Sequence, residues 1–234
     1  MTEIILAADK LTVEQCEALG GSLGPRLYAI KVHVLVDKEG PGVIERLKRA
    51  GWTQVWVDAK LHDIPATVEL RSKQLASAGA DIISVHAKGE VEMMEAALTC
   101  GKTIFGITEL TSVDEAQVEL SSGKSVLASV LYHARMAALV GLHGIVCSPQ
   151  EVGYLSKRPE LKTLNLVTPG IRLLGSDAHD QKRFDTPDAA AINGADYEVI
   201  GRELTQAQDP VAAYERIAGL IAQAKTGSIV DKRL

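Results

Sequence analysis

The chain has 234 residues, 46% of them hydrophobic, which is enough apolar material to bury the core of a full domain. Its 25 basic and 30 acidic residues give a net charge of −5 without any basic block, so nucleic acid is not expected as the main partner. A small anion held by a few local cations is not excluded.

The N-terminus and the cysteines bear on where the protein works. The first ten residues, MTEIILAADK, contain an apolar run of only five, which is too short for a signal peptide or a membrane span. Cys16, Cys100 and Cys147 are far apart and lack metal-ligand spacing, which favours free thiols in a reducing compartment. We therefore expect a cytoplasmic protein with no membrane partner.

Short β-rich segments alternate with segments of helical length from end to end. In chain order, the candidate strands are 4–9, 28–34, 54–60, 81–87, 103–110, 144–148, 164–170 and 197–201. Amphipathic stretches between them include 13–23, 65–79 and 124–141. This alternation predicts a parallel sheet covered by helices, and eight units favour a closed (β/α)8 TIM barrel that spans residues 1–234 as a single domain.

Several predicted helices carry local start signals. Thr12 and Gln15 have the spacing of a capping box before the first helix. The pairs Thr186-Pro187 and Asp209-Pro210 each place an N-cap residue before a first-turn proline.

The segment VWVDAKLHDIP (55–65) begins like a buried strand but contains four ionisable residues in six positions, namely Asp58, Lys60, His62 and Asp63. Because side chains alternate along a strand, Asp58 and Lys60 share a face, while Val57 takes the opposite face toward the helices. The polar pair therefore points into the barrel at the carboxyl end of the strand, where barrel enzymes place their chemistry. Considered alone, the pair fits a purely structural ion pair equally well.

Polar residues at other strand ends favour a functional site over a structural pair. They are Asp9, Lys31, His86, Thr111 and Ser112, which come from four further candidate strands or follow them directly. Side chains from so many strand ends converge on one barrel mouth, which a structural ion pair alone would not require.

The run DAKLHDIPAT (58–67) resembles the D-x-K-x-x-D-I-P-x-T signature of orotidine 5′-phosphate decarboxylases in their bacterial, single-domain form. Further matches follow in family order: LAAD (6–9), IKV (30–32), ISVHA (83–87), ELTS (109–112), VTPGIR (167–172), GSDAHDQKR (175–183) and VIGRELT (199–205). The resemblance implies decarboxylation of orotidine 5′-monophosphate (OMP) to uridine 5′-monophosphate (UMP), the last step of de novo pyrimidine nucleotide synthesis. It implies neither a cofactor nor a metal.

The resemblance also implies roles for the charged residues. Lys60 matches the residue that protonates C6 of the pyrimidine, with Lys31, Asp58 and Asp63 as its charged partners. Asp63 and Thr67 reach into the site of the neighbouring subunit, which implies a homodimer.

The remaining implied contacts surround the substrate. Asp9 matches a ribose contact, Ile64 another substrate contact, and Thr111 with Ser112 a contact near the base. Pro169 is a further expected substrate contact, and Arg172 and Gln181 are family-matched positions on the loop after the seventh strand. Gly201 and Arg202, after the eighth strand, are expected to bind the phosphate, because barrels of this kind often hold phosphate there. An arginine fork suits phosphate oxygens, and a glycine permits close backbone approach.

Three competing interpretations stay open on the sequence alone. Metal-dependent sugar-phosphate decarboxylases of the 3-keto-gulonate 6-phosphate type share the D-x-K-x-x-D framework, and a Schiff-base aldolase would use Lys60 as its nucleophile. A non-catalytic nucleotide-binding barrel is the third. His62 is interpreted as a turn residue and not as a base. His33 and Ala66 depart from the family pattern, and whether His33 alters the barrel mouth or faces a helix stays open.

Overall fold

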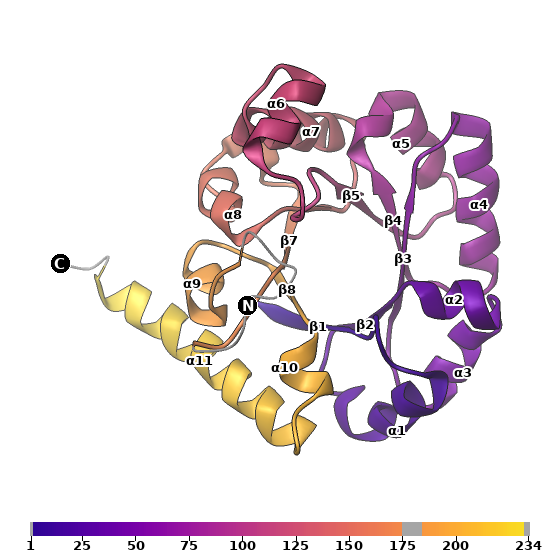
Figure 1. The fold of residues 1–234 in the computed structure, drawn as a ribbon, viewed down its shortest axis with the longest axis vertical. Helices are drawn as coiled ribbons and strands as arrows, with labels where there is room; N and C mark the ends of the chain where they lie inside the picture. The colour runs from indigo at the N-terminus through magenta and orange to yellow at the C-terminus, as the bar shows by residue number, and fades with distance from the viewer. Residues whose placement is uncertain (1, 175–183, 232–234) are drawn as a thin grey trace.

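The protein folds into a closed barrel of eight parallel strands in the computed structural model, which describes residues 2–174 and 184–231 (Figure 1). The strands are β1 (Glu3–Ala7), β2 (Ala29–Val32), β3 (Val55–Leu61), β4 (Ile82–His86), β5 (Thr103–Ile107), β6 (Gly144–Val146), β7 (Asn165–Pro169) and β8 (Tyr197–Ile200). Neighbours in sequence are neighbours in the barrel, and β8 pairs with β1 to close it. The predicted TIM barrel is confirmed, with each expected strand present and most of them shortened at the ends.

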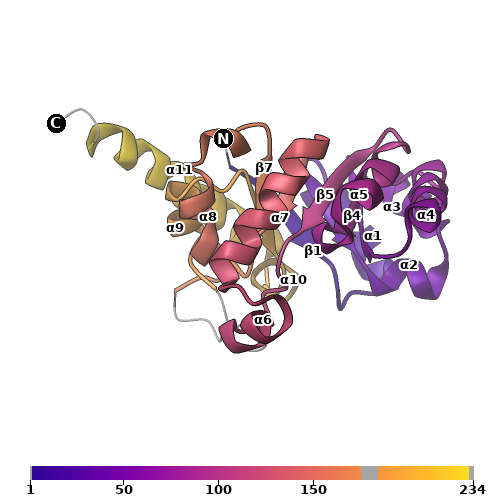
Figure 2. The ribbon, with the colours of Figure 1, turned by 90° about the horizontal axis from the view of Figure 1, so that it is seen from above.

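Helices surround the barrel. The α-helices are α1 (Val13–Leu23), α2 (Val34–Glu39), α3 (Val43–Arg49), α4 (Pro65–Ser77), α5 (Glu90–Leu98), α6 (Glu115–Ser122), α7 (Val126–Val140), α8 (Pro149–Leu155), α9 (Pro187–Ile192), α10 (Arg202–Thr205) and α11 (Pro210–Asp231). Two 3₁₀ turns, η1 (Ala87–Gly89) and η2 (Pro159–Leu161), complete the described elements. Helices α6 and α10 lie toward one end of the barrel, and the N-terminus lies at the other (Figure 2).

All three predicted helix starts are present, and those at Thr12 and Asp209 carry side-chain capping hydrogen bonds, whereas Thr186 precedes α9 without one. The Thr12 hydroxyl accepts from the backbone N–H of Gln15 at 3.3 Å, and the Gln15 side chain accepts from the Thr12 N–H at 2.8 Å. At the start of α11, Asp209 Oδ1 accepts from two backbone N–H groups, each at 3.0 Å. These bonds satisfy donors that a helix N-terminus otherwise leaves unpaired, so each helix begins where its sequence signal stands.

Apolar residues form two cores, one between the barrel and the helices and one inside the barrel. Inside, Trp56 packs edge-on against Phe105 with ring centroids 5.3 Å apart, and Tyr28 stacks on Tyr197 at 4.3 Å. Large rings therefore fill the interior near the amino ends of the strands, and the carboxyl end is left for a cavity.

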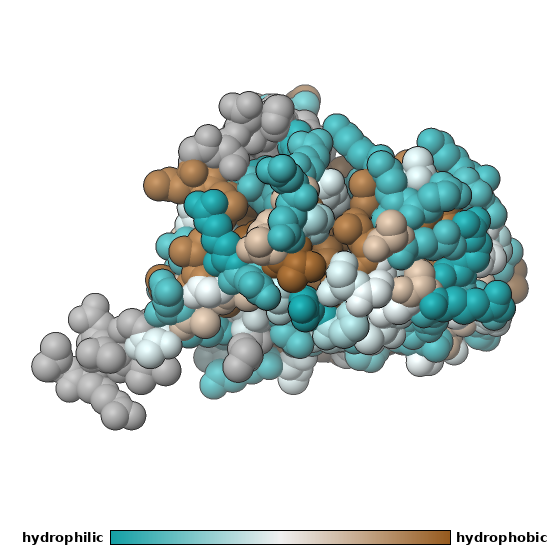
Figure 3. Space-filling view, turned by 90° about the horizontal axis from the view of Figure 1, so that it is seen from below, coloured by the Kyte–Doolittle hydropathy of each residue, from teal (hydrophilic) through white to brown (hydrophobic). Residues whose placement is uncertain are grey.

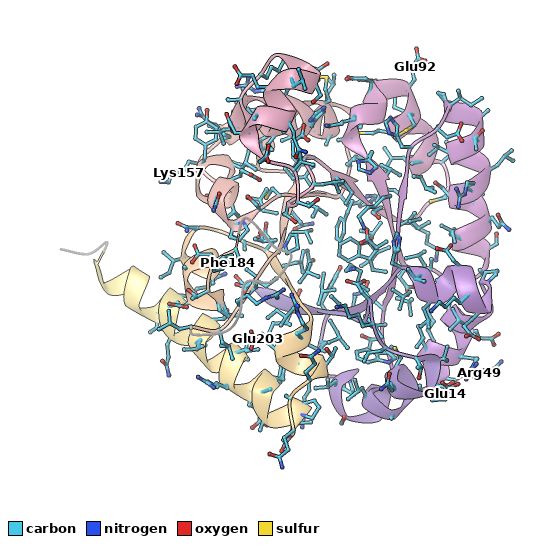
Figure 4. All side chains as sticks on the ribbon, viewed as in Figure 1. Glu14, Arg49, Glu92, Lys157, Phe184 and Glu203 are labelled. Atoms are coloured by element: carbon cyan, nitrogen blue, oxygen red, sulfur yellow. The ribbon has the colours of Figure 1, made fainter. Side chains whose placement is uncertain are left out.

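One face of the molecule is mainly hydrophilic (Figure 3). In Figure 3, teal residues dominate the face that is seen, with brown residues visible between them. The labelled Glu14, Arg49, Glu92 and Lys157 lie at the periphery in Figure 4 and point away from the barrel. Among the described helices, none has the length and apolar character needed to cross a membrane.

Glu198 is a fully buried acid on the outer face of the barrel wall. Its neighbours in register are Ile4 of β1 and Thr168 of β7. Within the described part of the chain, neither carboxylate oxygen of Glu198 nor the hydroxyl of Thr168 has a hydrogen-bond partner. Burial raises the pKa of Glu198 to about 9, and the charge of Lys225 only partly offsets that rise.

The raised pKa predicts how stability changes with pH. Between its ordinary value of 4.5 and about 9, the folded protein holds a proton that the unfolded chain releases, so the free energy of unfolding falls as pH rises. Glu198→Gln removes this dependence. Between pH 6 and pH 8, we expect the free energy of unfolding of wild type to fall by about 3 kcal/mol relative to that of the variant.

Urea unfolding at the two pH values measures the difference. Glu215→Gln, on the exposed side of α11, is the matched control and should follow wild type. If the free energy of unfolding changes equally with pH in wild type and in Glu198→Gln, the Glu198 carboxyl is ionised in the folded protein and the prediction is wrong.

Candidate active site

A cavity of about 310 Å³ opens at the carboxyl ends of the strands. Most residues expected at the site line it, namely Asp9, Lys31, Asp58, Lys60, Thr111, Pro169, Arg172, Gly201 and Arg202. Apolar side chains of Trp56, Ile107, Val146 and Val199 also line it. The cavity thus combines apolar walls with a few charged groups, as small-molecule sites commonly do.

Charges of alternating sign run from the first strand to the third. Lys31 Nζ lies 2.7 Å from Asp9 Oδ1 and 3.2 Å from Asp58 Oδ2, and Lys60 Nζ lies 2.5 Å from the same Asp58 oxygen. Lys31 and Asp58 are only 7% and 4% exposed, whereas the Lys60 side chain is 30% exposed toward the cavity. The two ends of the array, Lys60 and Asp9, are therefore the parts that a ligand in the cavity can reach.

The array holds Asp58 and Lys31 in their charged forms. Burial alone would raise the pKa of Asp58. The positive charges of Lys31 and Lys60 outweigh this effect and lower the pKa from 3.8 to about 2. Burial likewise lowers the pKa of Lys31, and the charges of Asp58 and Asp9 raise it above its ordinary value. Each buried charge is paired, so the site can hold them at neutral pH.

Lys60 does not reach this position by simple strand alternation. Its φ is +44°, in a region that residues with side chains rarely adopt, and the pairing of β3 with β4 shifts register between Val57 and Leu61. The prediction that Asp58 and Lys60 share the inner face is confirmed by their contact, but an irregularity in β3 and not its regular pleat brings them together.

The end of the cavity near β7 and β8 carries the arginines. Gly201 and Arg202 stand at the start of α10, and Arg172 is 9% exposed with its Nη1 donating to the Ile171 carbonyl at 2.8 Å. Ile171 and Asp185 form a β-bridge that joins the two chain segments on either side of residues 175–183. The labelled Phe184 and Glu203 lie on this side of the barrel in Figure 4. Gln181 lies outside the described residues.

Four expected residues do not line the cavity of their own chain. Asp63 is exposed and its Oδ1 accepts from the Ile64 N–H at 2.7 Å, and Ile64 itself is 66% exposed. Thr67, in the first turn of α4, and Ser112, beyond β5, are also absent from the lining. For Asp63 and Thr67, this position is compatible with the expected contact across a subunit interface.

The sequence interpretation missed residues that shape the site. Ser84 is completely buried in β4 and donates to Asp58 Oδ1 at 2.6 Å. Glu109 also lines the cavity. Its Oε2 lies 2.8 Å from Lys88 Nζ, and its Oε1 accepts a hydrogen bond from the Ser129 hydroxyl at 2.7 Å. A lone serine among apolar strand residues was the available signal for Ser84, whereas the partners of Glu109 come from distant segments.

The histidines near the site do not form a metal centre in the part of the chain that the structure describes. Across residues 2–174 and 184–231, no three His, Cys, Asp or Glu side chains are grouped so that they could hold a metal ion. Burial, followed by the nearby His62 and Lys60, lowers the pKa of His86 to about 4, so its ring is neutral at pH 7. His62 is exposed, as a turn residue would be.

The closed parallel barrel and a cavity in which Lys31 lies between two carboxylate groups define a (β/α)8-barrel enzyme with an array of paired charges at the carboxyl ends of its strands. The family model for the orotidine 5′-phosphate decarboxylase / HUMPS family matches residues 2–217. The chain belongs to this family.

Several similar proteins are named orotidine 5′-phosphate decarboxylase. The orotidine 5′-phosphate decarboxylase of Halalkalibacterium halodurans is 42% identical over 229 residues, which cover 92% of this chain and 96% of the relative. That of Streptococcus thermophilus is 40% identical and covers 91% and 94%. The crystal structure of the Lactobacillus acidophilus orotidine 5′-phosphate decarboxylase matches with a TM-score of 0.79 at 31% identity, covering 94% of this chain and 99% of that one.

Proposed function

We propose that this protein is an orotidine 5′-phosphate decarboxylase, which converts OMP to UMP and CO2 without a cofactor or metal. The observation that carries the proposal is the position of Lys60 Nζ in the cavity, 2.5 Å from a buried carboxylate that also pairs with Lys31. Relatives at 40–42% identity with this name support the same reaction.

The reaction needs a cation beside C6 of the pyrimidine. When the C6–carboxylate bond breaks, its electron pair stays in the plane of the ring, where the π-system cannot delocalise it. The Lys60 ammonium stabilises this negative charge and then donates a proton to C6, giving UMP, while the lysine is reprotonated from solvent. Asp58 keeps the ammonium oriented before substrate binds, which is electrostatic preorganisation. Repulsion of the substrate carboxylate by Asp58 is a separate contribution that we give secondary weight.

The other cavity residues bind the two ends of the nucleotide. Arg202, with the backbone of Gly201, binds the phosphate, because these residues follow β8, where barrels of this kind commonly hold phosphate. Pro169, Arg172 and Gln181 complete this end. Thr111 and Ser112 contact the base, and Asp9 contacts the ribose. Binding energy from the phosphate then helps to place C6 against Lys60.

The active unit is a homodimer in which Asp63 and Thr67 contribute to the site of the partner. Support comes from the exposure of Asp63 and of the neighbouring Ile64 in a single chain, together with Leu70 of α4, which is 71% exposed. Exposed apolar residues beside a polar site are typical of surfaces that another subunit covers.

Mixing two inactive variants tests the shared site. In a heterodimer of Lys60→Ala and Asp63→Ala chains, one of the two sites receives Lys60 and Asp63 from different chains and is intact. Random reassociation is therefore expected to restore about a quarter of wild-type activity. Absence of recovery, with subunit exchange shown by labelled chains, would contradict a site shared between subunits.

Turnover of OMP in a spectrophotometer tests the function itself. Loss of the ultraviolet absorbance of the orotate ring is the expected result, and it should persist in EDTA. Loss of activity in EDTA would favour the metal-dependent sugar-phosphate decarboxylases. Borohydride trapping of a carbonyl substrate on Lys60 would favour an aldolase, and nucleotide binding without turnover would favour a sensor.

A cytoplasmic location is part of the same proposal. Cys16, Cys100 and Cys147 are all free thiols, which supports a reducing compartment.

A further inference from the structure

The backbone segment that carries Asp58 and Lys60 is not paired with either neighbouring strand. Toward β2, the last registered pair is Val32 with Val57, because β2 ends there. Toward β4, Val57 pairs with Ile83 and Leu61 pairs with Val85. The two pairs are four residues apart in β3 and only two residues apart in β4. Residues 58–60 therefore have no register partner on either neighbouring strand.

Side chains replace the missing ladder bonds at this break. On the β4 side, the Ser84 hydroxyl accepts from the Lys60 backbone N–H at 3.1 Å and donates to Asp58 Oδ1 at 2.6 Å. On the β2 side, His33 Nδ1 lies 2.5 Å from the Asp58 backbone carbonyl oxygen. Because a carbonyl can only accept, Nδ1 must carry the proton and donate it.

The position of His33 explains why a side chain is needed there. It stands directly between β2 and α2, where the backbone leaves the strand with φ −130° and ψ −94°. On this edge, the Ile30 N–H donates to the Gln54 carbonyl, and continuation of that ladder would bring a backbone donor to Asp58. The turn into α2 removes that donor. An unpaired buried carbonyl is costly, and the imidazole N–H takes its place.

We propose that His33 is a positioning residue for the decarboxylation. Its ring holds the Asp58 carbonyl and thereby fixes the strained β3 segment from which the Asp58 carboxylate and the Lys60 ammonium project. This inference rests on the proposed function, since its effect is measured on that reaction. His33 does not line the cavity.

The test uses His33→Asn and His33→Leu as a matched pair. The two side chains have nearly the same shape, and the asparagine amide nitrogen occupies the place of Nδ1, so the pair differs in the ability to donate. We expect His33→Leu to lower kcat for OMP by about tenfold or more, since small displacements of catalytic groups have large rate effects. The Kd of UMP should stay within about twofold, and His33→Asn should keep most of the wild-type kcat.

A second measurement reports on Lys60 directly. By microscopic reversibility, Lys60 exchanges the C6 hydrogen of bound UMP with D2O, which NMR follows. The exchange rate should fall in parallel with kcat in His33→Leu, whereas a general loss of stability would leave it unchanged at a temperature where both variants are folded. If His33→Leu does not fold, His33→Ala takes its place with the same expectations.

Three results would overturn the inference. They are an unchanged kcat in His33→Leu, an equal loss in His33→Asn and His33→Leu, and a weakening of UMP binding as large as the loss of kcat/KM. The last would make the ring a substrate ligand. Failure of the proposed function is distinguishable, because wild type itself would then not turn over OMP.

Discussion

Replacing Lys60 with alanine is expected to reduce kcat/KM for OMP by at least about four orders of magnitude. The substitution removes both the charge that stabilises the carbanion and the proton that quenches it, and each contribution alone is worth roughly 10²–10³-fold or more. Decarboxylation followed by ultraviolet absorbance, at enzyme concentrations high enough to detect slow turnover, measures the loss.

UMP binding separates this effect from a loss of affinity. Because Lys60 acts on the transition state, the Kd of UMP should change by less than about tenfold in the variant. Lys48→Ala is the matched control, since Lys48 also forms an ion pair with an aspartate, Asp81, at 2.9 Å but lies at the amino end of the strands. If Lys60→Ala retains activity within tenfold of wild type, another group donates the proton and the proposed mechanism is wrong.

Asp58→Asn is expected to lower kcat/KM by about three orders of magnitude and also to destabilise the fold. The carboxylate pairs with two lysines and accepts from Ser84, so its neutral replacement leaves Lys31 buried with Asp9 as its one remaining carboxylate partner in the described chain. Lys60 loses the anchor that orients it toward the cavity. Loss of preorganisation and of a buried ion pair act in the same direction.

The stability effect of Asp58 has a defined pH window. With its pKa lowered from 3.8 to about 2, the ionised group stabilises the folded state above pH 3.8, and this contribution disappears as pH falls through about 2. Its size is on the order of 2 kcal/mol. Urea unfolding of wild type and Asp58→Asn should therefore differ at pH 7 and converge toward pH 2.

Asp81→Asn provides the control for Asp58→Asn. Asp81 pairs with Lys48 and accepts from the Val55 N–H at 2.9 Å, so the same chemical change is made away from the cavity. It should reduce stability and leave kcat/KM near wild type. A similar loss of kcat/KM in both variants would show that destabilisation, and not the loss of the site charge, explains the Asp58 result.

Much of the barrel could be read from local patterns. Strand-length apolar runs alternate with amphipathic stretches, and the capping box at Thr12 and the proline after Asp209 mark helix starts that the structure contains. The pairing of Asp58 with Lys60 was also predictable, because the two residues are two positions apart in a strand and their motif resembles that of a known family. These features depend on nearest neighbours along the chain, so one sequence suffices to define them.

Local patterns could not reveal how the segment 58–60 is supported. Ser84 and His33 contact it from the two neighbouring strands, and both contacts depend on where β2 ends and on how β3 shifts against β4. Register between strands is a property of their pairing and not of either strand alone. The open question about His33 is answered in this way, since its ring contacts the backbone carbonyl of Asp58 in β3 and does not line the cavity.

The sequence by itself determined the eight-unit barrel, the charged carboxyl end of β3 and the family to which the chain is similar. Only the tertiary structure decided that Asp9, Lys31 and Asp58 form one array, that Lys60 adopts a positive φ, and that Asp63 does not line the cavity of its own chain. The physical reason is barrel closure. It brings residues more than 20 positions apart within hydrogen-bonding distance, and no local pattern encodes the distances at which they meet.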